Sequence, residues 1–390
     1  MILTTIVLFL LILGVIVFVH ELGHFMIAKL YNVKVEEFAL GFPPRIFSFK
    51  KGETEYSLNA VPLGGYCKIV GENGEDKDDP RSFGSKSVGK RFLILSAGVI
   101  MNFVLAFVIF SAIFMAGFPQ DITNEKLSII KSENDRSFSE TGNVMQIEGA
   151  KSVKDVKVQI SEIVKDTPAD KAGLEIGDTI VKAGEKEIRS VEDLQKYTEE
   201  NLGKLIVLSI IRGKEDITKE ITPRAEHPDD EGAMGISLVK TAVVSYSPLE
   251  AIRKGYEYTV HLTVFIIMAF ASILWGLITT GKTAAEVSGP IGIAIMTKQA
   301  ASMGFMTILN FTALISVNLA IINALPFPAL DGGRLLFLVV EKIKGSPLNQ
   351  KWEAKANNVG FALLMLLMVV ITFKDITKFD LLGKVMNMLG

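Results

Sequence analysis

Cysteine and net charge are both nearly absent from this sequence. Cys67 is the only cysteine, so the chain can form neither an internal disulfide nor a metal site built from cysteines. The formal net charge is −2, which indicates no basic surface of the kind that binds nucleic acid. No nucleic-acid partner is therefore expected.

Hydrophobic residues, in contrast, make up 49% of the 390 residues, and the mean hydropathy is +0.37. That is too apolar for an ordinary soluble protein of this size, although 22% of the residues are charged. The apolar residues must therefore be segregated along the chain.

Four apolar runs with few or no charges account for this segregation. They lie at Ile2–Val19, Phe92–Phe118, Phe305–Ile322 and Val359–Phe373, and each approaches or exceeds the roughly 20 residues that cross a bilayer core. The first run lacks the basic start and the cleavage site of a signal peptide, so we interpret it as a retained span. The sequence predicts a polytopic α-helical membrane protein with about four transmembrane helices.

Lysine and arginine near the ends of these runs predict the orientation of the chain in the lipid bilayer. None precedes the first run. Basic residues follow the first run, precede the second and fill the loop between the last two: Lys29, Lys34, Lys86, Lys90, Arg91, Arg334, Lys342, Lys344, Lys351 and Lys355. The N-terminus and the region 119–304 should therefore be extracytoplasmic, and the loops at 29–91 and 334–355 cytoplasmic.

A further apolar stretch, Leu262–Ile278, has the hydropathy of another crossing. A crossing there would place Glu21 and Asp331 on opposite faces of the membrane. We therefore predict that this stretch is interfacial, re-entrant or packed against the bundle. A plain fifth span is the alternative.

The first run ends in His20-Glu21-Leu22-Gly23-His24, an H-E-x-x-H motif. On a helix the two histidines fall on one face, as capture of zinc requires. The Glu21 carboxylate can take a proton from an attacking water and pass it to the leaving amine. Counting about 1.5 Å per residue from Lys29 places His20 about 13 Å inside the membrane, where ionisable residues are costly and are functional candidates.

A catalytic zinc has three protein ligands and one open position, so one ligand is still needed. The third run ends in Asn323-Ala-Leu-Pro326-Phe-Pro328-Ala-Leu-Asp331-Gly332-Gly333. The two prolines end the helix and leave Asp331 in irregular backbone, which at membrane depth must be buried in protein or line a polar cavity. We predict one Zn²⁺ per chain, bound by His20, His24 and Asp331, although these ligands alone do not exclude other divalent ions.

The two motifs together closely resemble those of the site-2 protease family of intramembrane metalloproteases. Further segments resemble the bacterial branch of that family, which includes the regulator of sigma-E protease: Gly41-Phe42-Pro43-Pro44, Pro62-Leu63-Gly64-Gly65-Tyr66, Ser288-Gly289-Pro290 and Ala313–Asn323. The resemblance covers essentially the whole chain. It implies a protein of the bacterial inner membrane with the active site near the cytoplasmic side. By resemblance, Glu21 is the catalytic residue, Asn323 is a polar residue at the substrate path, and Pro326 and Pro328 shape that path.

The segment 45–69 contains two strand-like stretches around the turn Lys51-Gly52 and predicts a β-hairpin. The family resemblance suggests that the hairpin re-enters the membrane beside the active site, where its edge could pair with an extended substrate. The alternative is a surface hairpin on the cytoplasmic side.

Between residues 121 and 225 the composition becomes polar and mixed, which indicates an inserted extracytoplasmic α+β domain. Its Ala172-Gly173-Leu174 and Gly177-Asp178 resemble a recurrent pattern of bacterial PDZ domains. Such a domain can bind a peptide at a sheet edge, and a steric size filter is the alternative.

The predicted membrane core has two parts. The first is 1–118, with its second span at 92–118, and the other is 305–390, with the last span at 359–373. Residues 226–304 are expected to form a linker with interfacial or re-entrant helices.

The expected activity is zinc-dependent cleavage of a peptide bond in the transmembrane segment of a single-pass membrane protein. By resemblance, substrates are anti-sigma factors already trimmed on their outer side, as in regulated intramembrane proteolysis, or remnant signal peptides. Two other classes of membrane protein share some of these sequence features. An inactive membrane-anchored PDZ adaptor is disfavoured by the complete catalytic set, and a metal transporter by the lack of an internal repeat of spans.

Overall fold

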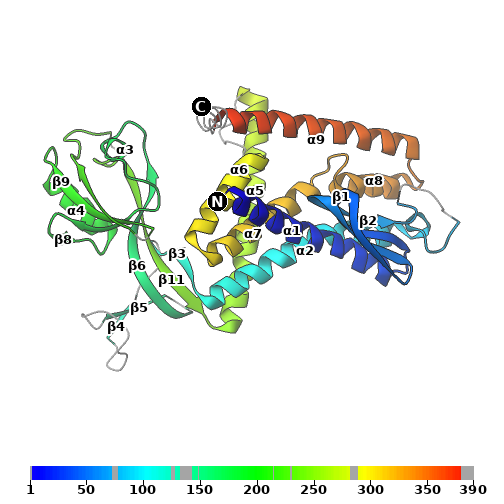
Figure 1. Cartoon of the computed structure of the whole chain (residues 1–390), viewed down its shortest axis with the longest axis horizontal. Helices are drawn as coiled ribbons and strands as arrows, with labels where there is room; N and C mark the ends of the chain where they lie inside the picture. The colour runs from blue at the N-terminus through cyan, green and yellow to red at the C-terminus, as the bar shows by residue number, and fades with distance from the viewer. Residues whose placement is uncertain are drawn as a thin grey trace. The chain divides into compact units, whose positions relative to one another are not determined.

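The computed structural model describes residues 2–72, 78–123, 128–131, 143–147, 149–213, 215–228, 231–281 and 289–378. The chain divides into two compact units (Figure 1): a membrane unit of residues 1–110 and 255–390, and an inserted unit of residues 111–254. Ser288 of the motif Ser288-Gly289-Pro290 and the segment 379–390 of the predicted second membrane part lie outside the described residues.

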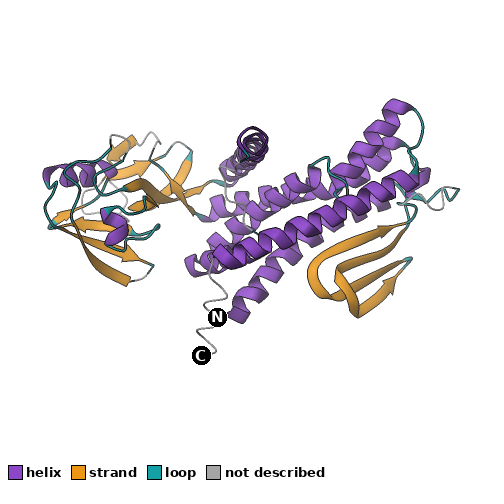
Figure 2. Cartoon of the chain, turned by 90° about the horizontal axis from the view of Figure 1, so that it is seen from above, coloured by secondary structure: helices purple, strands orange, loops and turns teal. Residues whose placement is uncertain are grey.

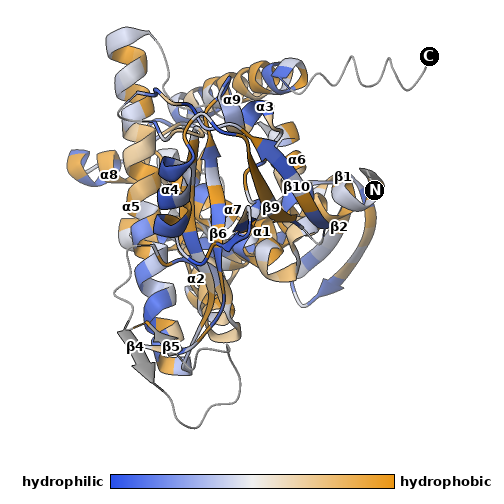
Figure 3. Cartoon of the chain, turned by 90° about the vertical axis from the view of Figure 1, so that its left-hand side faces the viewer, coloured by the Kyte–Doolittle hydropathy of each residue, from blue (hydrophilic) through white to orange (hydrophobic). Residues whose placement is uncertain are grey.

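Five helices in the described part of the chain are long and apolar enough to cross a membrane. They are α1 (Ile2–Leu30), α2 (Val88–Ala116), α5 (Pro248–Thr280), α7 (Phe305–Ala324) and α9 (Gln350–Lys378); Figure 3 colours the chain by the hydropathy of each residue. Apolar side chains on these helices remain exposed; Phe361 and Leu366 of α9 are 60% and 61% exposed. Lipid makes this exposure favourable, whereas water would make it costly. The chain is a membrane protein.

Helix α5 is a fifth helix that is long and apolar enough to span a membrane, whereas the sequence predicted about four transmembrane helices. It is one continuous helix of 33 residues that contains the whole stretch Leu262–Ile278. Most of its large apolar side chains are exposed, such as Trp275 at 70%, whereas Ile266 is buried. Five helices thus meet the length and composition of a span, and the interfacial position of residues 262–278 stays a prediction.

Two shorter α-helices, α6 (Pro290–Met303) and α8 (Asp331–Lys344), also lie in the described part of the membrane unit. Helix α6 packs against α1, α7 and α9. The buried carboxylate of Asp375 on α9 accepts a hydrogen bond of 2.8 Å from the Gly292 backbone N–H in the first turn of α6. A carboxylate is favourable there because the helix dipole is positive at its N-terminus.

A two-stranded antiparallel sheet follows α1 and packs against it; its strands are drawn in orange at the right of Figure 2. Its strands are β1 (Val35–Lys51) and β2 (Thr54–Ile69), joined by a turn at Gly52 with φ of 65°. The predicted hairpin is confirmed, but it starts at Val35. Both strands bend, so that Phe38 has partners on two sides, Tyr56 and Cys67. Residues 35–42 therefore lie in the middle of the sheet, with 45–51 and 61–69 at its edges.

The inserted unit is an α+β structure. Its elements are β3 (Phe118–Asp121), β4 (Ser128–Lys131), β5 (Asn143–Gln146), β6 (Ala150–Ile163), α3 (Pro168–Lys171), β7 (Thr179–Ala183), β8 (Lys186–Glu187), α4 (Val191–Glu200), β9 (Ile206–Arg212), β10 (Glu215–Ile221) and β11 (Ile236–Tyr246). The main sheet has the order β10-β9-β7-β6-β11-β3, with β8 on β7, and β4 pairs with β5. Leu194 of α4 and Leu208 and Ile210 of β9 are wholly buried in its core.

The PDZ-like pattern at 172–178 lies between a strand with a short helix and the next strand, in the order β6, α3, turn, β7. The turn is held by Asp178, whose wholly buried carboxylate pairs with Arg212 of β9 at 2.8 Å. The sheet continues past the predicted boundary at residue 225, because β11 pairs with β6 along most of its length. Residues 236–246 therefore belong to this unit and not to the expected linker.

Candidate active site

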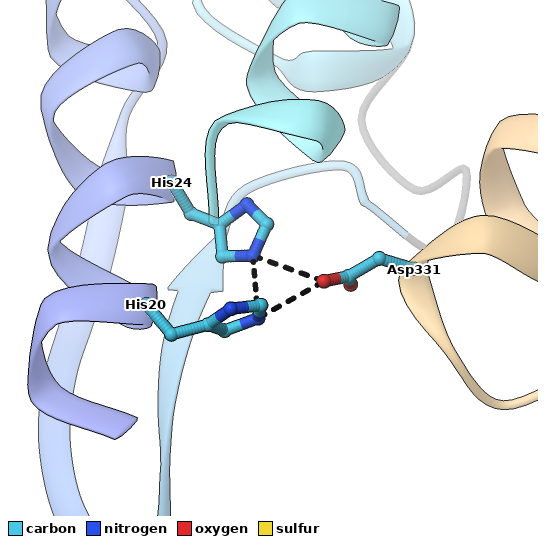
Figure 4. A group of neighbouring side chains, drawn as sticks. All are labelled: His20, His24 and Asp331. Carbon is cyan, nitrogen blue, oxygen red and sulfur yellow. Dashed lines mark hydrogen bonds and ion pairs between the residues drawn. The ribbon is translucent and has the colours of Figure 1, made fainter. Parts of the chain in front are cut away.

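His20 and His24 lie one turn apart near the C-terminal end of α1, and both are buried. The apolar residues before them favour a long helix, and the spacing of four places both imidazoles on one face. Figure 4 shows the two rings turned toward Asp331 of α8. The Nε2 atoms of the two histidines are 3.3 Å apart.

Asp331 reaches the histidines from a loop that turns sharply between α7 and α8. Pro326 and Pro328 lie in this loop, as predicted. Asp331, in contrast, is the first residue of α8 and does not lie in irregular backbone as expected. A Cβ at Gly332 would lie 2.2 Å from the carbonyl oxygen of Leu325, and one at Gly333 would lie equally close to that of Phe327. Only glycine permits such contact, so the two glycines after the aspartate make the turn possible.

The three atoms predicted to bind the metal form a nearly equilateral triangle. Asp331 Oδ2 lies 3.0 Å from Nε2 of His20 and 3.3 Å from Nε2 of His24. Tetrahedral zinc with ligands at about 2.1 Å has edges of about 3.4 Å between ligand atoms. Two imidazoles and one carboxylate are also the ligand types of catalytic zinc sites. The donor set and its spacing therefore fit zinc.

Close packing between α1 and α2 brings the α2 backbone against the imidazoles. A Cβ at Gly98 of α2 would lie 2.3 Å from Nε2 of His24, and one at Gly23 of α1 would lie 2.4 Å from the Ala97 carbonyl oxygen. Sequence reasoning missed Gly98. Small residues within an apolar run often mark close helix contacts and are the signal that would have found it.

Two groups on α2 contact the ring nitrogens that face away from Asp331. His24 Nδ1 lies 2.8 Å from the backbone carbonyl oxygen of Ile94, and His20 Nδ1 lies 3.3 Å from the amide of Asn102. Partners of this kind orient metal-binding histidines. Asn102 was also missed, although a polar residue within the apolar run 92–118 is a signal of function.

Glu21 lies between this cluster and the hairpin. Its carboxyl group receives a backbone hydrogen bond from Cys67 of β2. A Cβ at Gly65 would lie 3.4 Å from Glu21 Cγ. The edge of the sheet at 61–68 therefore runs beside the predicted catalytic residue.

The remaining predicted residues lie close to Asp331 along the chain. Asn323 is half-buried at the end of α7, and its amide makes no hydrogen bond to any residue within the described ranges. Helix α9 contacts the loop behind Asp331. The Asn357 side-chain oxygen accepts a hydrogen bond of 3.1 Å from the Ala329 N–H, and a Cβ at Gly360 would lie 2.3 Å from the Pro328 carbonyl oxygen. Ala329 has φ of 76°, a costly conformation for alanine that such contacts help to maintain.

The inserted unit contains a separate groove of about 480 Å³ between α4 and the start of β11. Residues from α4, from the loop before β11 and from β11 itself line it, including Leu194, Thr198, Met234, Ile236 and Leu238. In the described part of the chain, β11 pairs with β3 only at 241–244, so residues 236–239 have a sheet partner only in β6. The groove thus has a free strand edge on one wall and a helix on the other.

Comparison with known proteins gives the following similarities. The model of peptidase family M50 matches residues 8–367. The regulator of sigma-W protease RasP of Bacillus subtilis is 30% identical over 97% of this chain and 99% of its own. The zinc metalloprotease RasP of Oceanobacillus iheyensis is 31% identical over 96% of this chain and 99% of its own. A PDZ domain of the SdrC-like protein from Listeria monocytogenes has 20% identity and a TM-score of 0.19, covering 21% of this chain and 86% of that domain.

Proposed function

The chain belongs to peptidase family M50, and from this premise we propose that it cleaves the transmembrane segment of single-pass membrane proteins. It is a metalloendopeptidase, and its cofactor is zinc. In this proposal His20, His24 and Asp331 hold the zinc, and Glu21 is the catalytic residue. The convergence of three ligand atoms from segments 311 residues apart, at the spacing of a zinc site, carries the proposal.

When bound, zinc supplies Lewis acidity, which polarises the scissile carbonyl and lowers the pKa of water toward 7. Glu21 takes a proton from the attacking water and delivers it to the leaving nitrogen, since a carboxylate beside the ligands can act first as base and then as acid. The backbone hydrogen bond from Cys67 holds its carboxyl group in this position.

Substrate would bind in extended form along the hairpin edge. Residues 61–68 have a sheet partner on one side only, within the described residues, and Gly65 lies against Glu21 and α1. Pairing there exposes a scissile carbonyl that a transmembrane helix would keep hydrogen-bonded. The unpaired Asn323 amide and the loop with Pro326 and Pro328 would line the path from the other side. The exposed Ile46 and Phe47 of β1 support insertion of the sheet into the membrane.

The proposed orientation is that of a bacterial inner-membrane protein, with the N-terminus and inserted unit outside. Asp331 and His20 lie together at the C-terminal ends of α7 and α1, so these ends share one side of the membrane. An even number of crossings must then separate α2 from α7. Helix α6, with 14 residues, is about 21 Å long and too short to compensate for a crossing by α5. This supports an interfacial or re-entrant position for residues 262–278.

We also propose that the inserted unit is a PDZ domain whose groove binds the free C-terminus of a substrate already trimmed outside. The free edge of β11 opposite α4 supports this role. The test is binding of two peptides that differ only in a free carboxylate or an amide at the C-terminus. Tighter binding of the carboxylate form is expected, and equal or absent binding of both would favour the size filter.

Cleavage by purified protein tests the enzyme proposal. A trimmed anti-sigma factor and a remnant signal peptide would be offered in detergent to wild type, Glu21→Gln, Asp331→Ala and the control Asp375→Asn, with zinc quantified in each. We expect Glu21→Gln to keep zinc and lose at least about a hundredfold in rate. Asp331→Ala should lose zinc, whereas Asp375→Asn should keep it. Equal zinc content and equal rates in all four proteins would refute the assigned roles.

A further inference from the structure

Asn102 of α2 is a wholly buried polar side chain behind the two histidines. Its amide lies 3.3 Å from His20 Nδ1, and its side-chain oxygen Oδ1 has no hydrogen-bond partner among the residues that the structure describes. The Ser316 hydroxyl of α7 donates a hydrogen bond of 2.8 Å to the Asn102 backbone carbonyl, which holds this turn of α2 in place. A buried oxygen without a donor is costly, so its position calls for a functional explanation.

The contact of His24 with α2 shows which tautomer a histidine needs to bind zinc through Nε2. Its Nδ1 lies 2.8 Å from the Ile94 carbonyl oxygen, which can only accept a hydrogen bond. His24 must therefore carry its hydrogen on Nδ1. Its Nε2 then has a free lone pair directed at Asp331 and His20, as metal binding requires.

His20 has an amide as its partner, which can either donate or accept. If the Asn102 NH₂ group donated to His20 Nδ1, the neutral ring would carry its hydrogen on Nε2 and could not bind metal through that atom. The nitrogen and oxygen of an amide differ only by a half-turn and are assigned from their partners. A half-turn brings the unpartnered Oδ1 to His20 Nδ1 and gives His20 the same tautomer as His24.

We propose that Asn102 is a positioning residue for the zinc site: its Oδ1 accepts the Nδ1–H of His20 and so directs the Nε2 lone pair at the point where His24 Nε2 and Asp331 Oδ2 converge. This inference rests on the proposed function, because it assumes that His20 binds zinc through Nε2. It accounts for the contact with His20 and the burial of Asn102, and it gives Oδ1 a hydrogen-bond donor.

The experiment compares Asn102→Asp, which keeps an acceptor of the same shape, with Asn102→Leu, which removes it. Asn318→Leu is the matched control, because Asn318 is a half-buried asparagine of α7 whose amide donates to Leu314 of its own helix. The purified proteins would be loaded with zinc, and the rate of zinc loss to a chelator and the rate of substrate cleavage would be measured.

We expect Asn102→Leu to lose zinc about 10 to 100 times faster than wild type, as removal of such partners does elsewhere. Asn102→Asp and Asn318→Leu should stay within about threefold of wild type by the same measure. Unchanged zinc loss in Asn102→Leu would overturn the proposal, and equally fast loss in Asn102→Asp would show that the amide donates. If wild type itself binds no zinc or does not cut, the proposed function fails instead.

A spectroscopic measurement reads the tautomer without relying on activity. The chain has only four histidines, and His227 and His261 can be replaced by glutamine to leave the two of the site. In the zinc-loaded protein with ¹⁵N-labelled histidine, we expect both remaining rings to carry hydrogen on Nδ1. In Asn102→Leu the His20 signal should broaden or split while the His24 signal stays, and unchanged signals from both rings would count against the proposal. This comparison also separates a local effect from general misfolding.

Discussion

The two halves of the site are built in different ways. His20 and His24 belong to one regular helix, and their relative position follows from the spacing of four residues. Asp331 lies at the end of an irregular loop whose shape depends on two prolines, two glycines and contacts from α9. The histidine half is therefore encoded locally, whereas the aspartate half depends on parts of the chain that are distant in sequence. Substitutions that affect one half only can test this difference.

Gly98→Ala should have the largest effect, because it disturbs the histidine half directly. The new methyl group would overlap His24 Nε2, where a Cβ lies only 2.3 Å away. We expect loss of nearly all zinc and all measurable cleavage. Gly89→Ala in the same helix is the control, since a Cβ there meets nothing within 4 Å. Metal content by atomic spectroscopy is the measurement, and normal zinc in Gly98→Ala would contradict the close packing of α1 and α2.

Gly360→Ala should have the next largest effect, through the aspartate half. A Cβ at this position would lie 2.3 Å from the Pro328 carbonyl oxygen, so α9 or the loop must move. Overpacking of this kind costs about 1–3 kcal/mol. We expect weaker zinc retention and slower cleavage, measured against Gly14→Ala, whose added methyl meets open space in α1. If the two variants behave alike, α9 does not support the loop.

Asn357→Leu should have a smaller effect on the same half. It removes the acceptor for the Ala329 N–H and leaves that half-buried donor without its partner, at a cost of about 1–3 kcal/mol. We expect zinc loss about tenfold faster than in wild type. The adjacent Asn358 is exposed, and Asn358→Leu should leave zinc loss unchanged. Equal rates of zinc loss in the two variants would show that Asn357 does not support the loop.

The smallest effect concerns the anchoring of the histidine helix to the hairpin. Glu53 accepts hydrogen bonds from Arg81 and from Lys29 at the end of α1, and these lower its pKa from 4.5 to about 2. The stability that this carboxylate adds is complete above pH 4.5 and is lost as the pH falls toward 2. We expect wild type to melt slightly above Glu53→Gln at pH 6, with the gap closing gradually between pH 5 and 2. A gap that stays constant with pH would contradict the assignment.

The features that could be predicted from the sequence are those that depend on local pattern or on ligand chemistry. The apolar runs coincide with α1, α2, α7 and α9, the Lys51-Gly52 turn with the hairpin, and the two motifs with residues that the structure brings together. The start of the hairpin at Val35 and the place of β11 were not found, because both depend on pairing between distant segments. Asn102 and Asn357 were missed for the same reason, since their partners lie 82 and 28 residues away.

Helix α9, which supports the loop between α7 and α8, is the last helix of the described chain to be synthesised. Synthesis proceeds from the N-terminus, so α1, α2 and the loop with Asp331 enter the membrane before residues 350–378. A chain elongated only to α8 possesses all three proposed ligands, but nothing yet occupies the positions of Asn357 and Gly360 behind Pro328 and Ala329. The proposed metal site would therefore be completed only once residues 350–378 are in place.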